Sequence, residues 1–433
     1  MANWLKQLYG GVVTGTLLLG SAAASALTLP EAVRHTLETN PEVLATRNQL
    51  SSREEEIRQA RAGYLPTLDA AAGIGKQELE APSTGNEKVR LTRHEASLSA
   101  RQLVFDGFAT QEEVARQEAR HSSAFYNSLA TEENTALRTA EVYLNLLRQY
   151  ELLDIARETL YEHQNIHDQM VLRNKSGVGS KADLDQIVAR LALANSNLIT
   201  AQNNLLDSQT NFYRVTGLQP QLDNLQTPSV NQPLPTTQEQ AEAEALKEHP
   251  TLLSANADID AAEAQYNTSE SPMWPRLHLE ADKSWDEDID GVEGENRDWQ
   301  VMLRMRYNLY NGGADSARRR QTAHLLEEAK DVRNNTQRQV VESLRLSWAA
   351  HQAISSQYKY LELHVRAATD TKAAYLKQFN IGRRTLLDLL NTENELVDAR
   401  RALINASYDK LFSQYRIFNS MGQLVKEIGA GKS

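Results

Sequence analysis

Cysteine is absent from the 433-residue chain, and both glycine (20 residues) and proline (11 residues) are scarce. Without cysteine, the protein has neither a disulfide framework nor a thiolate metal site. A chain with so few turn-forming residues is typical of long helices joined by few turns. The formal net charge of −11 argues against nucleic acid as the main partner.

Long apolar runs are missing too, except near the start of the chain. Lys6 precedes an apolar stretch from Gly10 to Gly20, and Ala24-Ser25-Ala26 has the form of a signal-peptidase site. The stretch is too short to cross the ~30 Å core of a bilayer. Residues 1–26 are therefore predicted to be a signal peptide. No later run predicts a transmembrane helix, so any membrane-spanning part has to consist of β-strands.

The remaining chain repeats itself once. Motifs of the first half recur in the same order in the second: Asn40-Pro41 as His249-Pro250, Phe105-Asp106-Gly107 as Tyr310-Asn311-Gly312, Gly179 with Asp185 as Gly382 with Asp388, and Tyr213-Arg214 as Tyr415-Arg416. Such a long-period repeat indicates duplication of one structural unit. The predicted parts are a first repeat at 27–216, a Pro- and Gln-rich linker at 217–238, a second repeat at 239–422 and a tail at 423–433.

Each repeat is predicted to contain a helix of about 30 residues, two strands, a very long helix and a return helix. Residues 108–173 and 314–380 lack proline and glycine, which predicts helices of roughly 100 Å. The return helix after Gly179 carries a heptad of apolar residues: Leu184, Ile187, Leu191, Ala194, Leu198, Ala201 and Leu205. Helices of this length must associate along their sides, so several hairpins side by side would form a tube. A soluble antiparallel coiled coil has the same pattern.

Residues 297–310 alternate between apolar and polar side chains. The apolar positions, with aromatic residues towards both ends, are Trp299, Val301, Leu303, Met305, Tyr307 and Leu309. A membrane strand has about 9–11 residues, with an apolar face towards lipid and a polar face towards the lumen. These six side chains are therefore predicted to face lipid. Residues 276–285, 68–74 and 96–100 alternate in the same way, although a half-buried strand of a soluble sheet has this period too.

Four strands cannot close a barrel, because the smallest membrane barrels have about eight. An open sheet edge in lipid is not viable, since its backbone groups would lack hydrogen-bond partners. The chain must therefore pool its strands with other copies, and three copies would supply 12 strands and 12 helices.

Several motifs bear a family resemblance: Leu29-Pro30-Glu31-Ala32-Val33, Thr39-Asn40-Pro41-Glu42, Tyr64-Leu65-Pro66, Leu103-Val104-Phe105-Asp106-Gly107 and Gly382-Arg383-Arg384-Thr385-Leu386-Leu387-Asp388-Leu389-Leu390. Through them nearly the whole mature chain resembles the TolC family of outer-membrane factors. The resemblance implies a mainly α protein with a membrane β part. It implies a homotrimer in the outer membrane, with a 12-stranded β-barrel continued by a periplasmic 12-helix α-barrel tunnel. A periplasmic adaptor and an inner-membrane pump are expected at the tunnel tip, with no cofactor.

Two motifs look most like the type I secretion branch of this family: Phe105-Asp106-Gly107-Phe108-Ala109-Thr110, and Gly177-Val178-Gly179 with Ala182-Asp183-Leu184-Asp185-Gln186. This branch works with an ABC transporter and exports unfolded proteins such as adhesins and toxins. The main alternative is the outer-membrane factor of a drug-efflux pump driven by protons. A soluble coiled-coil scaffold of the periplasm is a remote alternative.

The resemblance also implies a gate at the tunnel tip. In the family, polar links between neighbouring coils close the entrance, and a ring of aspartates lines it. Asp388 matches the first ring aspartate, and Arg384 is expected to bond towards the first-half coil near Asp185. Phe379 stands where the family often has a tyrosine, and Asn391 where some members have a second aspartate. One hydroxyl link and some ring charges are therefore expected to be missing.

Two other groups of residues have the spacing of metal sites. His163 and His167 lie four residues apart on a helix, a spacing that can hold zinc. Asp286, Asp288, Asp290 and Gly291 begin like a calcium loop, but Arg297 stands where a bidentate glutamate is needed. A solvated helix face and an acidic loop are the preferred interpretations. No nucleophile, base or phosphate loop supports an enzyme.

Overall fold

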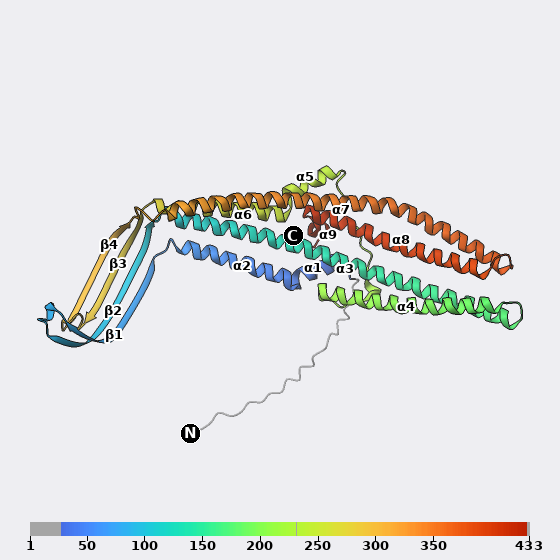
Figure 1. Cartoon of the computed structure of the whole chain (residues 1–433), viewed down its shortest axis with the longest axis horizontal. Coiled ribbons are helices and arrows are strands. Elements are labelled where there is room, and N and C mark those ends of the chain that lie inside the picture. The colour runs from blue at the N-terminus through green and yellow to red at the C-terminus, as the bar shows by residue number, and fades with distance from the viewer. Residues whose placement is uncertain (1–26, 231, 431–433) are drawn as a thin grey trace, which may run out of the picture.

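A computed structural model describes residues 27–230 and 232–430, so the expected signal peptide lies outside the described residues. The described chain is an elongated layer of helices that continues at one end into a curved sheet (Figure 1). Within the described residues, none of the helices carries an apolar stretch long enough to cross a bilayer.

The two halves contain the same series of elements. The first half consists of α1 (Leu29–Thr39), α2 (Pro41–Ala62), β1 (Thr67–Glu80), β2 (Lys88–Phe105), α3 (Ala109–Lys175) and α4 (Lys181–Thr216). The second consists of α5 (Gln238–Glu248), α6 (Pro250–Thr268), β3 (Arg276–Glu287), β4 (Glu295–Arg306), α7 (Ala314–Asn380) and α8 (Leu386–Met421), followed by α9 (Leu424–Ile428). Short 3₁₀ turns lie at Pro82–Thr84, Leu222–Asn224 and Ser271–Met273.

The single first helix predicted for each half is wrong, because a proline divides it. Asn40 before Pro41 is extended (φ −66°, ψ 127°), and so is His249 before Pro250 (φ −63°, ψ 121°). The proline ring disfavours helical backbone in the preceding residue. Each of these residues then caps the next helix: the Asn40 side chain accepts from the backbone N–H of Glu42 at 2.9 Å, and the His249 ring from that of Thr251 at 3.2 Å.

The long hairpins of the two halves match residue for residue. α3 and α7 have 67 residues each, and α4 and α8 have 36 each. The equivalent hairpin glycines are Gly177 and Gly382, which both take left-handed backbone with φ of 75° and 73°. The pairing of Gly179 with Gly382 and of Asp185 with Asp388 is therefore wrong by two residues. Asp183 is the counterpart of Asp388.

The predicted match of Tyr213 with Tyr415 is also shifted. Gly217 and Gly422 end the two return helices in the same left-handed conformation, both with φ of 72°. Counting back from these glycines makes Phe418 the counterpart of Tyr213. Both sequence matches failed because residues of the same or a similar type lie close by, such as Gly177 beside Gly179 and Asp183 beside Asp185, and the wrong one was matched.

The four strands form one antiparallel sheet in the order β1-β2-β3-β4, so β1 and β4 are its edges. β4 ends at Arg306 rather than at residue 310 as predicted. The Asn308 side chain accepts from the backbone N–H of Tyr310 at 3.1 Å, a local turn that competes with strand pairing. Tyr307 and Leu309 therefore lie between the sheet and α7, outside the strand.

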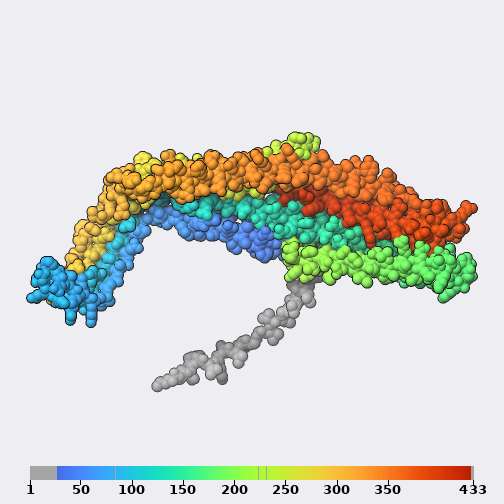
Figure 2. Space-filling view, viewed as in Figure 1, coloured from blue at the N-terminus to red at the C-terminus, as the bar shows by residue number. Residues whose placement is uncertain are grey.

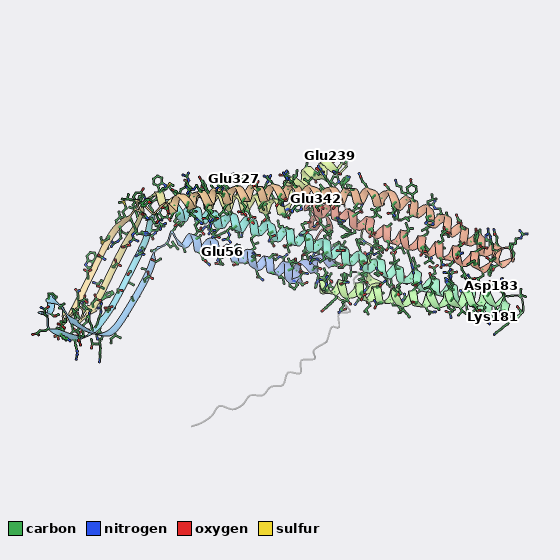
Figure 3. All side chains as sticks on the ribbon, viewed as in Figure 1. Glu56, Lys181, Asp183, Glu239, Glu327 and Glu342 are labelled. Carbon is green, nitrogen blue, oxygen red and sulfur yellow. The ribbon has the colours of Figure 1, made fainter. Side chains whose placement is uncertain are left out.

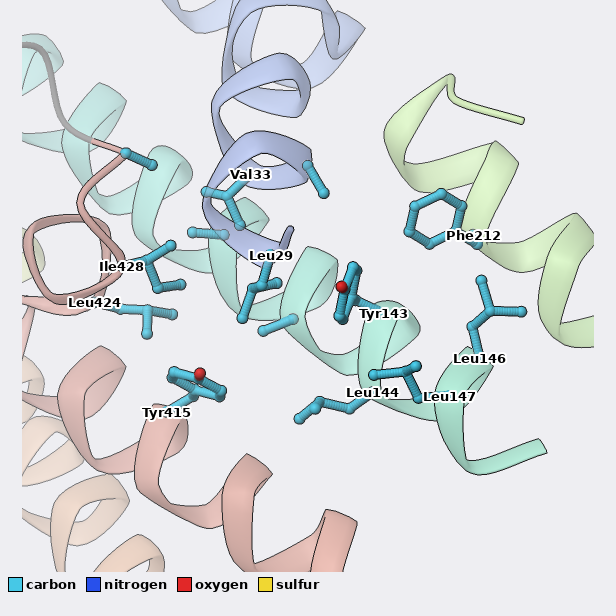
Figure 4. Packing of buried hydrophobic residues seen from close by; sticks show 14 of the residues in the cluster. Leu29, Val33, Tyr143, Leu144, Leu146, Leu147, Phe212, Tyr415, Leu424 and Ile428 are labelled. Carbon is cyan, nitrogen blue, oxygen red and sulfur yellow. The ribbon is translucent and has the colours of Figure 1, made fainter. Parts of the chain in front are cut away.

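The largest apolar core lies midway along the helices, where α1, α3, α4, α8 and α9 meet (Figure 4). Tyr143 and Phe212 pack against each other in it, with ring centroids 6.3 Å apart and the ring planes tilted by 55°. Glu133 of α3 holds α9 in place, because its carboxylate accepts from the backbone N–H groups of Leu424 and Val425 at 2.8 and 3.1 Å. Burial raises the pKa of Glu133 to about 7.

The helices of the two hairpins lie side by side in the order α4-α3-α8-α7 (Figure 1). α3 packs against its own return helix α4 and also against α8 of the second half. α4 and α7 are consequently the edges of this layer, as Figure 2 shows for the end away from the sheet. The sheet edges β1 and β4 have no strand partner among the described residues. In the helix layer, α6 and α5 cover the part of α7 nearer the sheet, and the part of α7 towards the hairpin tip packs mainly against α8 among the described helices.

Candidate functional site

One face of the sheet is mostly apolar in all four strands, although the register also places Gln102 of β2 and Lys283 of β3 on it. The β4 side chains Trp299, Val301, Leu303 and Met305 point to this face, and each is 58–69% exposed. The strand register places Leu68 opposite Ala100, Ala100 opposite Ala281 and Ala281 opposite Val301. Because partners in register share a face, the apolar face extends across the whole sheet.

The opposite face of the sheet is polar and carries ion pairs. Glu280 of β3 lies 2.7 Å from Arg304 of β4 and 3.3 Å from Arg101 of β2. Next to them, Gln300 donates to Asp282 at 3.2 Å. A sheet with one apolar and one charged face suits a barrel wall between lipid and a water-filled lumen.

A closely packed turn joins the sheet to the long helices. Gly107 has left-handed backbone (φ 71°), and a Cβ atom there would lie 2.6 Å from the Ser271 carbonyl oxygen and 2.8 Å from Trp274 Cβ. The Asp106 carboxylate accepts from the backbone N–H of Thr110 at 2.9 Å and so satisfies one of the free N–H groups in the first turn of α3. Phe105, Phe108 and Trp274 pack edge to face over this turn, with centroids 5.4–6.5 Å apart.

At the far end, an apolar cluster joins the tips of the two hairpins. Its buried members come from all four helices: Ile166, Met170, Ile187, Phe379, Leu386, Leu389 and Leu390. Phe379 is 4% exposed, and Arg173 of α3 lies over its ring at 4.7 Å. Phe379 therefore links the two hairpins through its ring, a contact that the sequence did not predict.

Asp388 is held in the first turn of α8. Its carboxylate accepts from the Thr385 hydroxyl at 2.9 Å, while the backbone N–H of Asp388 donates to the same hydroxyl at 3.2 Å. Hydrogen bonds from Thr385, and then the charge of Arg384, lower the pKa of Asp388. Asp183 stands at the tip of α4 (Figure 3). It makes the same capping pair with Ser180.

The contacts of Arg384 lie within its own hairpin. Its guanidinium donates to Gln378 at 3.0 Å, lies over the Tyr375 ring at 4.2 Å and is 3.9 Å from Asp388. Asp185 and Asn391 are exposed on α4 and α8. The expected bond from Arg384 towards the coil near Asp185 stays a prediction, since Arg384 has these partners within a single chain.

Polar pairs join the two hairpins above the tip, along what we call the α3–α8 seam. Arg148 lies 3.1 Å from Asp409, Glu151 accepts from Tyr408 at 2.6 Å, and Arg400 lies 2.8 Å from Glu158. This seam was not predicted from the sequence, because a heptad pattern shows which face of one helix is apolar but not which helix of the other repeat packs on it.

Closer to the tip, Lys372 of α7 bridges the halves. It lies 2.7 Å from the buried Glu393 of α8 and 3.2 Å from Glu162 of α3. Burial alone would lower the pKa of Lys372, but the hydrogen bonds and charges of the two glutamates outweigh it and raise the pKa. The amine therefore stays charged and links both hairpins.

The two groups with metal-site spacing do not converge. His163 is buried, which corrects its assignment to a solvated face, and its Nδ1 lies 2.8 Å from the Thr159 carbonyl oxygen. Asp288 accepts from the backbone N–H of Gly294 at 2.9 Å, and Asp290 lies 3.5 Å from Arg93. In the part of the chain that the structure describes, no three His, Asp or Glu side chains are placed to hold a metal ion.

Comparison with known proteins gives one consistent family. A family profile described as "Outer membrane efflux protein" matches residues 32–218 and 243–423. The chain is 25% identical to the outer membrane efflux protein BepC of Brucella suis over 428 residues, 98% of this chain and 91% of BepC. It is 24% identical to the outer membrane protein TolC of Vibrio cholerae over 446 residues, 99% of this chain and 98% of TolC.

A relative with a narrower name is the alkaline protease secretion protein AprF of Pseudomonas aeruginosa. It is 23% identical over 431 residues, which are 95% of this chain and 88% of AprF. Among solved structures, the CmeC outer membrane channel of Campylobacter jejuni has the same fold, with a TM-score of 0.81 at 15% identity. The match covers 98% of this chain and 94% of CmeC.

Proposed function

Because the chain belongs to the outer membrane efflux protein family, we propose that three copies form the outer-membrane duct of a tripartite export machine. The observation that carries this proposal is the four-stranded sheet, which has an apolar face and two unpaired edges. Neither edge is viable in lipid unless another copy pairs with it. The family membership places the protein in the outer membrane and argues against the soluble periplasmic scaffold.

The lipid-facing surface in this proposal is the apolar sheet face with Trp299, Val301, Leu303 and Met305. Tyr307 and Leu309 follow β4 and lie towards the helices. Together with Trp274 and Phe108 they supply aromatic and apolar side chains where the sheet meets the helices. Such side chains are enriched at the boundary between lipid and water.

Within the family we propose type I secretion, with a periplasmic adaptor and an inner-membrane ABC transporter as partners. The motifs around Phe105 and Gly177 support this branch, and so does the likeness to AprF, whose name denotes protease secretion. Drug efflux with a proton-driven pump is the second candidate, supported by the likeness to BepC, which is named an efflux protein.

Deletion of the gene in the native cell separates the two candidates. Type I secretion predicts that a large protein disappears from the culture medium, whereas the growth-inhibiting concentrations of novobiocin and erythromycin change little. The intact gene, supplied in trans, should restore secretion. Unchanged secretion together with strong drug sensitivity would overturn the type I assignment in favour of efflux.

The hairpin tips serve, in this proposal, as the periplasmic gate. Arg384 is expected to hold the closed tip against the coil of a neighbouring hairpin, so Arg384→Ser should raise single-channel conductance in planar bilayers. The adjacent, exposed Arg383 gives a matched control, because Arg383→Ser removes the same charge beside the site. Equal conductance of the two variants would remove Arg384 from the gate.

Asp388 is expected to form a ring of three carboxylates that attracts cations. Asp388→Ala should therefore lower the preference for K⁺ over Cl⁻, while Asp388→Glu should keep it. Because the pKa of Asp388 is lowered, its charge and the selectivity should persist when the solution is made mildly acidic. Reversal potentials in a KCl gradient measure this selectivity, and an unchanged value for Asp388→Ala would contradict the ring.

A further inference from the structure

The internal duplication predicts a contact that a single chain cannot show. Within the chain, the long helix of the first repeat, α3, packs against the return helix of the second, α8. The equivalent contact would join α7 to a first-repeat return helix. The chain's own α4 lies at the opposite edge of the layer from α7 (Figure 1). The missing partner of α7 is therefore α4 of another copy.

The edge helices carry matching apolar stripes for such a contact. On α4, Ile199, Leu206 and Tyr213 recur every seven residues and are 50–66% exposed. On α7, Leu346 and Tyr360 are 60% and 74% exposed and stand two heptads apart. Exposed heptad stripes on two antiparallel helices are the usual seam of a coiled coil. A helix face that stays in water does not need large apolar side chains at this regular spacing, so the stripes indicate a packing surface.

The chemistry of this contact follows from residue equivalence. Residues at the same place in equivalent helices are compared, α3 with α7 and α8 with α4. The pairs Arg148–Asp409, Glu151–Tyr408 and Glu158–Arg400 then correspond to Ala353–Asn204, Ser356–Asn203 and Leu363–Asn195. All six of these counterparts are exposed in the single chain, and none is charged. The ion pairs of the α3–α8 seam therefore have no equivalent between copies.

We propose that α4 of one copy packs on α7 of the next through an uncharged seam, so that the tunnel alternates between ionic seams within chains and neutral seams between them. This inference rests on the proposed trimer and specifies its contacts. Salt screens charges over about 10 Å at 0.1 M and about 3 Å at 1 M. High salt should therefore loosen the seam within each chain and leave the seam between copies intact.

A transplanted ion pair tests the residue equivalence. Leu363→Glu places an uncompensated charge in the neutral seam and should lower the ratio of trimer to monomer in detergent by about tenfold or more. Adding Asn195→Arg recreates the Glu158–Arg400 pair between copies and should restore the trimer. Size-exclusion chromatography with light scattering measures the ratio, and circular dichroism checks that each variant is helical. Failure of the double variant to recover would overturn the equivalence.

Cysteine pairs provide a second test. Because the chain has no cysteine of its own, no native thiol can form a competing disulfide. Oxidised Ala353→Cys with Asn204→Cys should give covalent trimers, whereas Arg148→Cys with Asp409→Cys should crosslink within a chain without added mass. The Arg148→Cys and Asp409→Cys variant keeps the Glu158–Arg400 and Lys372–Glu162 pairs between the same hairpins. Between 0.1 and 1 M KCl the rate of its crosslink should therefore fall, whereas that of the Ala353→Cys and Asn204→Cys crosslink should not.

The possible failures are distinct. A wild-type monomer in detergent would remove both the trimer and its seam. If the wild type were a trimer but the Ala353→Cys and Asn204→Cys variant formed no crosslink, the seam would be overturned and the proposed trimer would stand. Equal salt dependence of the two crosslinks would overturn the contrast between neutral and ionic seams.

Discussion

Alanine in place of Gly107 is expected to destabilise the protein by about 2–5 kcal/mol, because two costs combine there. The backbone at Gly107 is left-handed, which disfavours any residue with a Cβ atom. The new methyl would also lie only 2.6 Å from the Ser271 carbonyl oxygen and 2.8 Å from Trp274 Cβ. The turn cannot yield to it easily, since Ser271 belongs to a backbone that enters β3.

Gly382→Ala is the matched control for this prediction. Gly382 has the same left-handed backbone (φ 73°), but a Cβ atom there would meet no atom within 4 Å. Only the backbone cost of about 1–2 kcal/mol should then apply. Thermal unfolding in detergent, followed by circular dichroism, compares the two variants. Equal losses of stability would show that the junction is not tightly packed around Gly107.

Arginine at Leu303 should prevent assembly in the membrane. Leu303 lies in the middle of the apolar face of β4, where burying a charge near the bilayer centre costs about 2–4 kcal/mol. In a trimer the substitution occurs three times around one barrel. We therefore expect little folded Leu303→Arg protein in the outer membrane and a lower urea midpoint in lipid vesicles.

Met302→Arg tests the same strand at the next residue. Met302 lies on the polar face beside Arg304, whose guanidinium already lies next to the Glu280 carboxylate. The new side chain should reach the water of the lumen, so assembly should be close to that of the wild type. If both variants failed equally, the alternation of β4 would not separate lipid from lumen.

Periodicity predicted the regular parts of this fold well. The long α3 and α7, their return helices and the four strands all follow from apolar spacing and from the scarcity of proline. The predictions failed where a proline ring or a local side-chain hydrogen bond sets the backbone conformation. Pro41 and Pro250 each divided a predicted helix, and the Asn308 side chain ended β4 early.

The site was predictable only in part, because its contacts cross the boundary between the repeats. The capping pair of Thr385 and Asp388 is local, and the sequence motif already contains it. The contact of Phe379 with the first hairpin and the bridge from Lys372 to Glu162 join residues far apart in sequence. Their meeting depends on how two long helices rotate against each other, which no short motif encodes.

The equal lengths of the two hairpins restrict how such a chain can change. A helical turn inserted into one hairpin alone would move its tip by about 5.4 Å and leave the rim of the tunnel uneven. The apolar cluster that holds Phe379 against Ile166 and Met170 would then lose its register. We therefore expect an insertion or deletion in one hairpin to be tolerated only together with an equal change in the other. The two repeats can then diverge in sequence while their hairpins keep the same length.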